Sequence, residues 1–369
     1  MTVPFFDLKR QISGMRVELD SAIAETIDSA AFILGPKVAE LEKFSAGVLG
    51  VKYAIGVASG TDALLLALKA IGIGQDDEII TSPFTFVATA EAISYHGAKP
   101  VFIDLTTKTF NMDVSKIEKA ITKKTKAILP VHLYGQPADM SPIMDLAKKY
   151  NLKVIEDCAQ AIGAKYKDKS VGSIGDIGCF SFFPTKNLGC FGDGGLVTTN
   201  SDEIADMIKV LRGHGSRVTY HYDYIGYNSR LDSIQAAILL VRFKYLKDWT
   251  EKRRANAALY RKLLAGVSQI KLPTEDSNVY HVYNQFTILA ESRDKLFDFL
   301  KKKNVGCMVY YPLSLHLQKA FQNLGYKKGD LPQSELAQDS VLSLPIFPEL
   351  TKEEIEETVS AVKEFYGKS

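Results

Sequence analysis

The feature that most restricts the fold of this chain is a regular alternation of strand-like and helix-like segments. Between residues 53 and 156, short apolar segments alternate with longer ones of helical character. We expect strands at 53–58, 78–81, 100–103, 127–133 and 153–156, and helices at 61–70, 87–95 and 142–150. Such alternation predicts βαβ units and a mostly parallel sheet with helices on its faces. Ligands of these sheets bind beyond the carboxyl ends of the strands, so residues there are the first site candidates.

The rest of the chain is organised differently. A long helical stretch is predicted from Ser233 to about Leu264, and beyond about residue 270 strand-like pieces alternate with helices. The chain ends in an amphipathic helix that starts with the capping-box pair Thr351 and Glu354. We therefore expect two domains: a large α/β domain at 1–245, which includes an N-terminal helical segment, and a smaller α+β domain at 246–369.

Composition limits what the chain binds. The 45 basic and 43 acidic residues give a net charge of +2 without a dense basic block, which argues against nucleic acid as a partner. The four cysteines lack CxxC spacing, so free thiols in a reducing compartment are expected rather than disulfides, and no metal is expected. Neither a signal-peptide pattern nor an apolar run of the ~18 residues that span a membrane is present, which predicts a cytoplasmic protein. A small molecule is the expected partner.

Two segments suit the binding of a phosphorylated ring. Ser59-Gly60-Thr61 lies between a predicted strand and a predicted helix, where backbone N–H groups of a helix start hold phosphate. Thr61 equally suits an ordinary helix cap. Asp157 follows a buried strand directly, where its carboxylate either holds a protonated ring nitrogen or caps the next segment.

Two more segments suit covalent chemistry on such a ring. Lys186 stands between an apolar aromatic strand and the glycine turn 192–195. A lysine has a pKa of ~10.4 in water, and partial burial lowers it enough for Schiff-base formation; the alternative is a solvated lysine at a loop tip. Phe86 ends the aromatic segment 82–86, which either stacks on a flat ring or belongs to the core. Together the four segments supply what pyridoxal phosphate (PLP) requires, in the chain order Gly60–Thr61, Phe86, Asp157, Lys186.

With these motifs the chain resembles the DegT/DnrJ/StrS family of PLP-dependent sugar-nucleotide aminotransferases over essentially its full length. The segments that carry the resemblance are FILGPKVAELEKF, VASGTDALLLAL, SPFTFVATAEAI, KPVFIDL, EDCAQAIGA, SFFPTKNLGCFGDGG, GYNSRLDSIQAAIL and VYYPLSLH. The resemblance implies the aspartate-aminotransferase fold (PLP fold type I), PLP as cofactor, and a homodimer with active sites at its interface.

The resemblance also implies roles for individual residues. Lys186 would form the Schiff base and move the proton, and Asp157 would pair with the ring nitrogen. The other implied cofactor contacts are Gly60, Thr61 and Ser181 at the phosphate, Phe86 on the ring, Gln160 near the ring hydroxyl, and Asn228 at the phosphate of the neighbouring subunit's cofactor. Arg230, Tyr311 and His316 would face the substrate. Alternatively, Arg230 pairs only with Asp232 and His316 only caps a turn.

The implied reaction moves an amino group from L-glutamate to a keto sugar carried on dTDP or UDP, giving an amino sugar for glycans or secondary metabolites. The turn Gly192-Asp193-Gly194-Gly195 resembles members that act at C3, whereas members that act at C4 tend to carry Gly-Glu-Gly-Gly, so a 3-keto sugar is favoured. The alternatives are a C4-specific enzyme, a sugar dehydratase, an amino-acid aminotransferase, and a non-enzymatic regulatory protein that binds a sugar nucleotide. A dehydratase would carry histidine in place of Lys186, and a regulatory protein would show a decayed site.

Overall fold

A seven-stranded sheet forms the centre of the computed structural model, which describes residues 2–367. Six of its strands run in the same direction, and only β9, which is antiparallel to both of its neighbours, runs the other way, so the expected mostly parallel sheet is confirmed. In spatial order the strands are β1 (Tyr53–Val57), β9 (Gly195–Thr199), β8 (Ile177–Ser181), β5 (Lys153–Asp157), β4 (Thr125–Leu129), β2 (Glu78–Thr81) and β3 (Lys99–Phe102).

Helices cover both faces of this sheet because successive strand residues point to opposite sides. Ile79 and Ile155 pack in one apolar cluster, whereas their neighbours Ile80 and Val154 pack in another on the opposite face. The first cluster includes side chains of α4 (Gly60–Ala70), α5 (Ala88–Tyr95) and α8 (Asp202–Arg212). The second face is covered by α3 (Pro36–Leu49), α7 (Met140–Tyr150) and α9 (Ser233–Phe243).

Two sequence-based boundaries are wrong. The strand expected at 127–133 ends at Leu129, because Pro130 follows and a proline has no N–H for the ladder. The long helix expected from Ser233 is interrupted between α9 and α10 (Leu246–Leu264). At this break Lys244 and Tyr245 bond to carbonyls three residues back rather than four. The break lets α9 follow the central sheet while α10 packs in the C-terminal core.

The C-terminal part has its own antiparallel sheet in the order β12 (Ile270–Lys271), β14 (Phe286–Ala290), β15 (Val341–Leu344). Its core includes side chains of α10, α11 (Arg293–Lys302) and α13 (Lys352–Phe365). The predicted capping box of α13 is confirmed in both of its hydrogen bonds. Helix α12 (Pro332–Ser340) lies beside β14.

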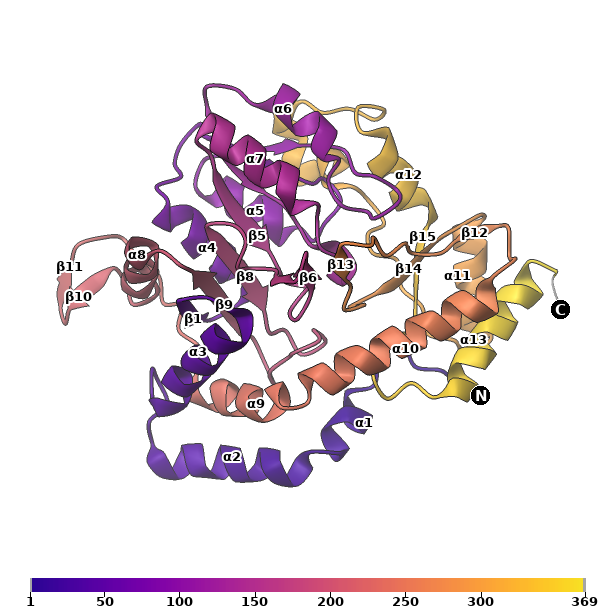
Figure 1. The fold of residues 1–369 in the computed structure, drawn as a ribbon, viewed down its shortest axis with the longest axis horizontal. Coiled ribbons are helices and arrows are strands. Elements are labelled where there is room, and N and C mark those ends of the chain that lie inside the picture. The colour runs from indigo at the N-terminus through magenta and orange to yellow at the C-terminus, as the bar shows by residue number, and fades with distance from the viewer. Residues whose placement is uncertain (1, 368–369) are drawn as a thin grey trace.

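The N-terminal segment reaches back to the C-terminal part. Val3 forms a parallel bridge with Val305, and Arg10 of α1 (Leu8–Ser13) makes two hydrogen bonds to Glu354, at 2.8 and 2.7 Å. Helix α2 (Arg16–Ser29) lies along α9 (Figure 1). The domain boundary at 245 therefore stays a prediction, because the first residues pack on the C-terminal core.

The remaining elements are short. The hairpin β10–β11 projects beyond α8, away from the central sheet (Figure 1). The small elements are β10 (Ser216–Val218), β11 (His221–Tyr222), α6 (Ile117–Ala120), and a sheet of β13 (Val279–Tyr280), β6 (Lys165–Tyr166) and β7 (Lys169–Ser170). Across residues 2–367, no helix is both long and apolar enough to span a membrane.

Candidate active site

A cavity of about 440 Å³ lies at the carboxyl ends of β1, β5 and β8. Its volume is in the range typical of small-molecule sites. The cavity is lined by short segments from distant parts of the sequence, including 59–64, 85–89, 157–160, 181–186 and 310–311. Eight of the eleven predicted site residues line it: Gly60, Thr61, Phe86, Asp157, Gln160, Ser181, Lys186 and Tyr311.

One end of the cavity is suited to an anion. The first backbone N–H groups of a helix have no hydrogen-bond partner within that helix. At the start of α4, the Ser59 hydroxyl accepts one of them, the backbone N–H of Asp62, at 3.0 Å. The N–H groups of Gly60 and Thr61 remain for a ligand. A Cβ on Gly60 would lie 2.6 Å from the Cβ of Ser181, so only glycine lets the helix start approach that hydroxyl. These features fit a phosphate group.

Asp157 is the buried carboxylate of the site, with 4% of its surface exposed. Its Oδ1 accepts the Ala159 N–H at 3.1 Å, and its Oδ2 accepts the Thr89 hydroxyl at 2.8 Å. Burial raises the pKa of this carboxyl above its usual value, and the two hydrogen bonds and the nearby Lys186 charge counteract part of that rise. The carboxylate is thus suited to a cationic N–H donor such as a protonated ring nitrogen.

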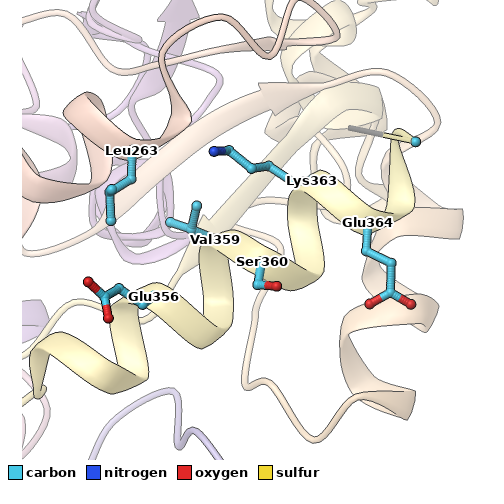
Figure 2. A pocket seen from close by; sticks show the side chains of 7 residues that line it. Leu263, Glu356, Val359, Ser360, Lys363 and Glu364 are labelled. Atoms are coloured by element: carbon cyan, nitrogen blue, oxygen red, sulfur yellow. The ribbon is translucent and has the colours of Figure 1, made fainter. Parts of the chain in front are cut away.

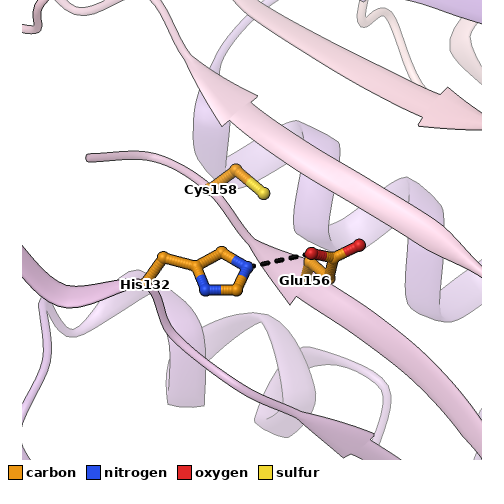
Figure 3. A group of neighbouring side chains, drawn as sticks. All are labelled: His132, Glu156 and Cys158. Carbon is orange, nitrogen blue, oxygen red and sulfur yellow. Dashed lines mark hydrogen bonds and ion pairs between the residues drawn. The ribbon is translucent and has the colours of Figure 1, made fainter. Parts of the chain in front are cut away.

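A buried histidine–glutamate pair supports the strand that carries Asp157 (Figure 3). His132 Nε2 lies 3.0 Å from Glu156 Oε2, and His132 Nδ1 accepts the Ala138 N–H, which places the imidazole proton on Nε2. The backbone N–H of His132 also donates to the Asp157 carbonyl, at 3.0 Å. The pair therefore anchors the end of β5 directly behind the site.

His132, Glu156 and Cys158 have the spacing of a possible metal cluster, but their contacts use the atoms that a metal would need. Besides His132, Glu156 accepts three backbone N–H groups, from residues 172, 174 and 175. Burial, together with the nearby Glu156 and Asp157 carboxylates, holds the pKa of the Cys158 thiol well above its usual value, so it is not a thiolate ligand. We interpret the cluster as structural support.

Lys186 reaches the cavity from a tight loop after β8. Its backbone N–H donates to the Phe183 carbonyl, and Cys190 donates back to Phe182, which closes the loop. The side chain is half-buried, and burial lowers the pKa of the amine from 10.5 to about 8, although the Asp157 charge acts in the opposite direction. Close to one tenth of such amines are neutral at neutral pH, compared with a negligible share of exposed lysines. The amine is therefore a usable nucleophile and base.

Gln160 and Tyr311 join the two parts of the molecule at the cavity wall. The side-chain oxygen Oε1 of Gln160 accepts the Tyr134 N–H at 2.6 Å, and its side-chain Nε2 donates to the Tyr311 hydroxyl at 3.2 Å. A side-chain amide carries two N–H donors, so one remains for a ligand oxygen. Phe86 also lines the cavity, but 57% of its surface is exposed. Its ring is therefore not part of the core and is free to cover a ligand.

Three predicted residues lie outside the cavity that residues 2–367 form. Asn228 is exposed beside the β10–β11 hairpin. Arg230 is half-buried, and within the described chain it makes no ion pair with Asp232 and its Nε has no partner. His316 is buried, with Nε2 3.2 Å from Glu335 Oε1. The roles expected of Asn228, Arg230 and His316 stay predictions.

Sequence reasoning missed several polar residues of the site. Thr89 bonds to Asp157, and an amide pair holds the lysine loop: Asn187 donates to the Val282 carbonyl and accepts from Asn284, both at 3.0 Å. Asn187 could have been predicted as a site residue, because it follows Lys186 directly. No local sequence pattern marks Thr89 or Asn284, because their hydrogen-bond partners are far away in the sequence.

A separate hollow of about 650 Å³ lies between α10 and α13 (Figure 2). Leu263 and Val359 form its apolar part, and Glu356, Lys363 and Glu364 surround them. Glu364 is paired with Lys303 at 2.7 Å and Glu356 with Lys352 at 3.5 Å. This surface contains none of the predicted site residues, and we assign it no ligand.

Comparison with known proteins agrees with this geometry. The sequence profile of the DegT/DnrJ/EryC1/StrS aminotransferase family matches residues 14–363. The chain belongs to this family. The family consists of PLP-dependent aminotransferases, so the resemblance noted in the sequence is confirmed.

Individual relatives cover nearly the whole chain. A protein of Geobacillus stearothermophilus named pleiotropic regulatory protein is 50% identical over 99% of both chains. The UDP-N-acetyl-3-dehydro-alpha-D-glucosamine 3-aminotransferase of Acidithiobacillus ferrooxidans is 47% identical over 98% of this chain and 97% of its own. The crystal structure of Streptomyces venezuelae DesV in complex with a ketimine intermediate is similar with a TM-score of 0.97, at 41% identity over 100% of this chain and 99% of DesV. The expected aminotransferase fold is confirmed.

Proposed function

We propose that the chain is a PLP-dependent aminotransferase that converts a nucleotide-linked 3-keto sugar into a 3-amino sugar, with L-glutamate as amino donor. The observation that carries the proposal is the pairing of Lys186, whose pKa is lowered, with the buried Asp157 in one cavity. A lysine and a carboxylate so placed are the two groups that this cofactor chemistry requires.

The residues of the cavity fit PLP at each of its ends. Gly60, Thr61 and Ser181 would hold its phosphate, Asp157 its ring nitrogen, and Lys186 its carbonyl carbon. When bound, the cofactor supplies a protonated ring that withdraws electrons from the reacting carbon. Lys186 would take the proton from the α-carbon of the donor in the first half of the reaction, and in the second half it would deliver a proton to the sugar carbon that receives the amino group. Its pKa near neutrality suits both directions of transfer.

The loop that carries Lys186 and the names of the relatives both support a 3-keto sugar as the substrate that receives the amino group. Asp193 of the turn 192–195 lines the cavity, and this turn resembles that of enzymes that act at C3. The Acidithiobacillus relative is named for the same position on a UDP-linked sugar. We therefore propose a 3-keto sugar on UDP or dTDP as the acceptor.

A second copy of the chain would complete the site. Large apolar side chains are exposed in the segment 32–48 and in the hairpin region 218–225, where Tyr220 and Ile225 are 84% and 89% exposed. Exposed apolar surface of this extent marks an interaction site. Asn228 adjoins the second region, in line with its predicted contact across a homodimer interface. Light scattering of the purified protein tests this, and a monomeric mass would contradict it.

A regulatory role is the second candidate, because the Geobacillus relative is named as a regulatory protein. A regulator that only binds a sugar nucleotide has no need of a reactive lysine. The intact Lys186 and Asp157 favour the enzyme.

One experiment separates the two candidates. PLP is added to the wild type and to Lys186→Ala, and the visible absorbance of a lysine-bound cofactor is followed. We expect the band in the wild type only, its loss on addition of L-glutamate, and its return with a UDP- or dTDP-linked 3-keto sugar. A wild-type band that glutamate does not change, or no band, would favour the regulatory role.

A further inference from the structure

Two neighbouring hydroxyl groups lie behind Asp157 without a role in the chemistry described so far. Thr85 Oγ1 lies 3.1 Å from Thr89 Oγ1, and Thr89 Oγ1 donates to Asp157 Oδ2 at 2.8 Å. Both threonines line the cavity wall and are almost fully buried, with 3% and 1% of their surfaces exposed. Water therefore does not replace either hydroxyl.

The proton order in this chain of hydroxyls is fixed. An ionised carboxylate accepts hydrogen bonds and donates none, so the single proton of Thr89 is directed to Asp157. Thr89 then accepts the proton of Thr85. The other oxygen of Asp157 is held by the Ala159 N–H, so each carboxylate oxygen has one protein donor and keeps a lone pair for a ligand.

Thr89 differs in this respect from other buried threonines in helices of the chain. Thr26, Thr250 and Thr358 each donate to the backbone carbonyl four residues earlier, the usual partner of a helical threonine. Thr89, in the first turn of α5, instead donates across to β5. Its hydroxyl therefore serves the site rather than its own helix.

The same contacts join Asp157 to the loop that carries Phe86. Phe86 follows Thr85 directly, and its carbonyl accepts the Thr89 N–H at 3.3 Å. On the basis of the proposed function, we propose that Thr89, oriented by Thr85, is a positioning residue: it fixes the plane of the Asp157 carboxylate relative to Phe86, so that the carboxylate meets the ring nitrogen of a cofactor covered by that side chain.

The charges around Asp157 agree with this role. The Lys186 charge favours the ionised form of Asp157, and the His132 imidazole also lies nearby, with its Nδ1 accepting the Ala138 N–H. The Cys179 thiol and the Tyr311 phenol also lie near it, and burial raises the pKa of both groups, so neither adds a charge near neutral pH. Ala159 and Thr89 are thus the two neutral donors that stabilise the anion.

The experiment compares four variants with the wild type. Thr89→Val keeps the shape and removes the donor, Thr89→Ser keeps the hydroxyl, and Thr85→Val removes only the group that orients it. Thr250→Val is the matched control, a buried helical threonine outside the cavity. Two quantities are measured: the dissociation constant of PLP as a function of pH, and the ¹⁵N chemical shift of ring-labelled bound PLP, which reports whether the ring nitrogen is protonated.

For Thr89→Val we expect a roughly 10-fold rise in the dissociation constant, the size expected for a lost hydrogen bond to a charged group. The acidic limb of the binding curve should move to higher pH, and the ring nitrogen should lose part of its protonation, because Asp157 holds a proton more readily without its donor. Thr85→Val should fall between this variant and the wild type. Thr89→Ser and Thr250→Val should bind PLP like the wild type.

The proposal is overturned if Thr89→Val matches Thr250→Val in affinity, acidic limb and ¹⁵N shift. If Thr89→Val does not fold, Thr85→Val and Thr89→Ser decide. The proposal is contradicted if the acidic limb of PLP binding in Thr85→Val equals that of the wild type, or if Thr89→Ser does not bind PLP like the wild type. Failure of the proposed function has a different signature, since the wild type itself would then not bind PLP.

Discussion

Replacing Lys186 by methionine is expected to stabilise the cofactor-free protein at neutral pH, because the change removes an amine whose charged form is disfavoured by burial. The fold lowers the pKa of this amine from 10.5 to about 8. At about 1.4 kcal/mol for each pKa unit, that fall corresponds to about 3 kcal/mol of lost stability. Water in the cavity screens part of this cost, so we expect a gain of about 1–3 kcal/mol.

The pH dependence of the unfolding free energy shows whether the charge of Lys186 causes the difference in stability. In the unfolded chain the lysine keeps its proton up to a pKa of 10.5, whereas in the folded chain it does so only up to about 8. Between these values the unfolded state binds more protons, so the Lys186 contribution makes the wild type more stable as the pH rises. The loss of folding stability caused by burying the charged Lys186 amine is complete below about pH 8 and absent above 10.5. The methionine variant lacks this titration.

Urea unfolding of the wild type, Lys186→Met and Lys119→Met at about pH 7 and about pH 9 measures both effects. Lys119 is exposed on α6 and is the matched control, for which no change is expected. The difference between the wild type and Lys186→Met should shrink at the higher pH. A methionine variant no more stable than the wild type at neutral pH, or a difference that does not change with pH, would refute the reasoning.

Two further predictions concern the helix start at the site and the packing of the N-terminus. Gly60→Ala should weaken PLP binding by about 10-fold or more, because the new Cβ would lie 2.6 Å from the Cβ of Ser181. The control Gly47→Ala, in α3, adds a Cβ that has no atom within 4 Å and should leave PLP binding unchanged. Equal affinities of the two variants in a PLP titration would contradict this prediction. Glu354→Gln should cost about 1–2 kcal/mol in thermal unfolding at neutral pH, because the carboxylate loses its charge toward Arg10. Burial alone would raise the pKa of Glu354, but the contacts with Arg10 and the Thr351 N–H lower it by more, so the pKa in the folded protein lies below the usual 4.5. The wild-type advantage should therefore be complete above about pH 4.5 and be lost as the pH falls through the lowered pKa. An equal loss at acidic pH would indicate a packing effect instead.

Local sequence was sufficient for the central fold and for most of the cavity. The alternation of apolar segments predicted the parallel sheet, and residues at or shortly beyond the ends of its strands, such as Asp157 and Lys186, line one cavity. This works because parallel strands bring their carboxyl ends to one edge, so a position at a strand end is also a position in space. The helix break at Lys244 was not predictable in this way, because it depends on two cores that the two halves join separately.

By itself, the sequence determined the order of the elements and the candidate residues at the strand ends, because both depend on the spacing of residues near one another in the chain. Only the tertiary structure decided which polar groups support them. Thr89 lies 68 residues from Asp157, and Asn284 lies 97 residues from Asn187. His316 is buried with its Nε2 3.2 Å from Glu335, a contact that the sequence did not predict, while its role toward the substrate stays a prediction. Hydrogen bonds between distant segments depend on how the helices pack on the sheet, and no local pattern in the sequence records that packing.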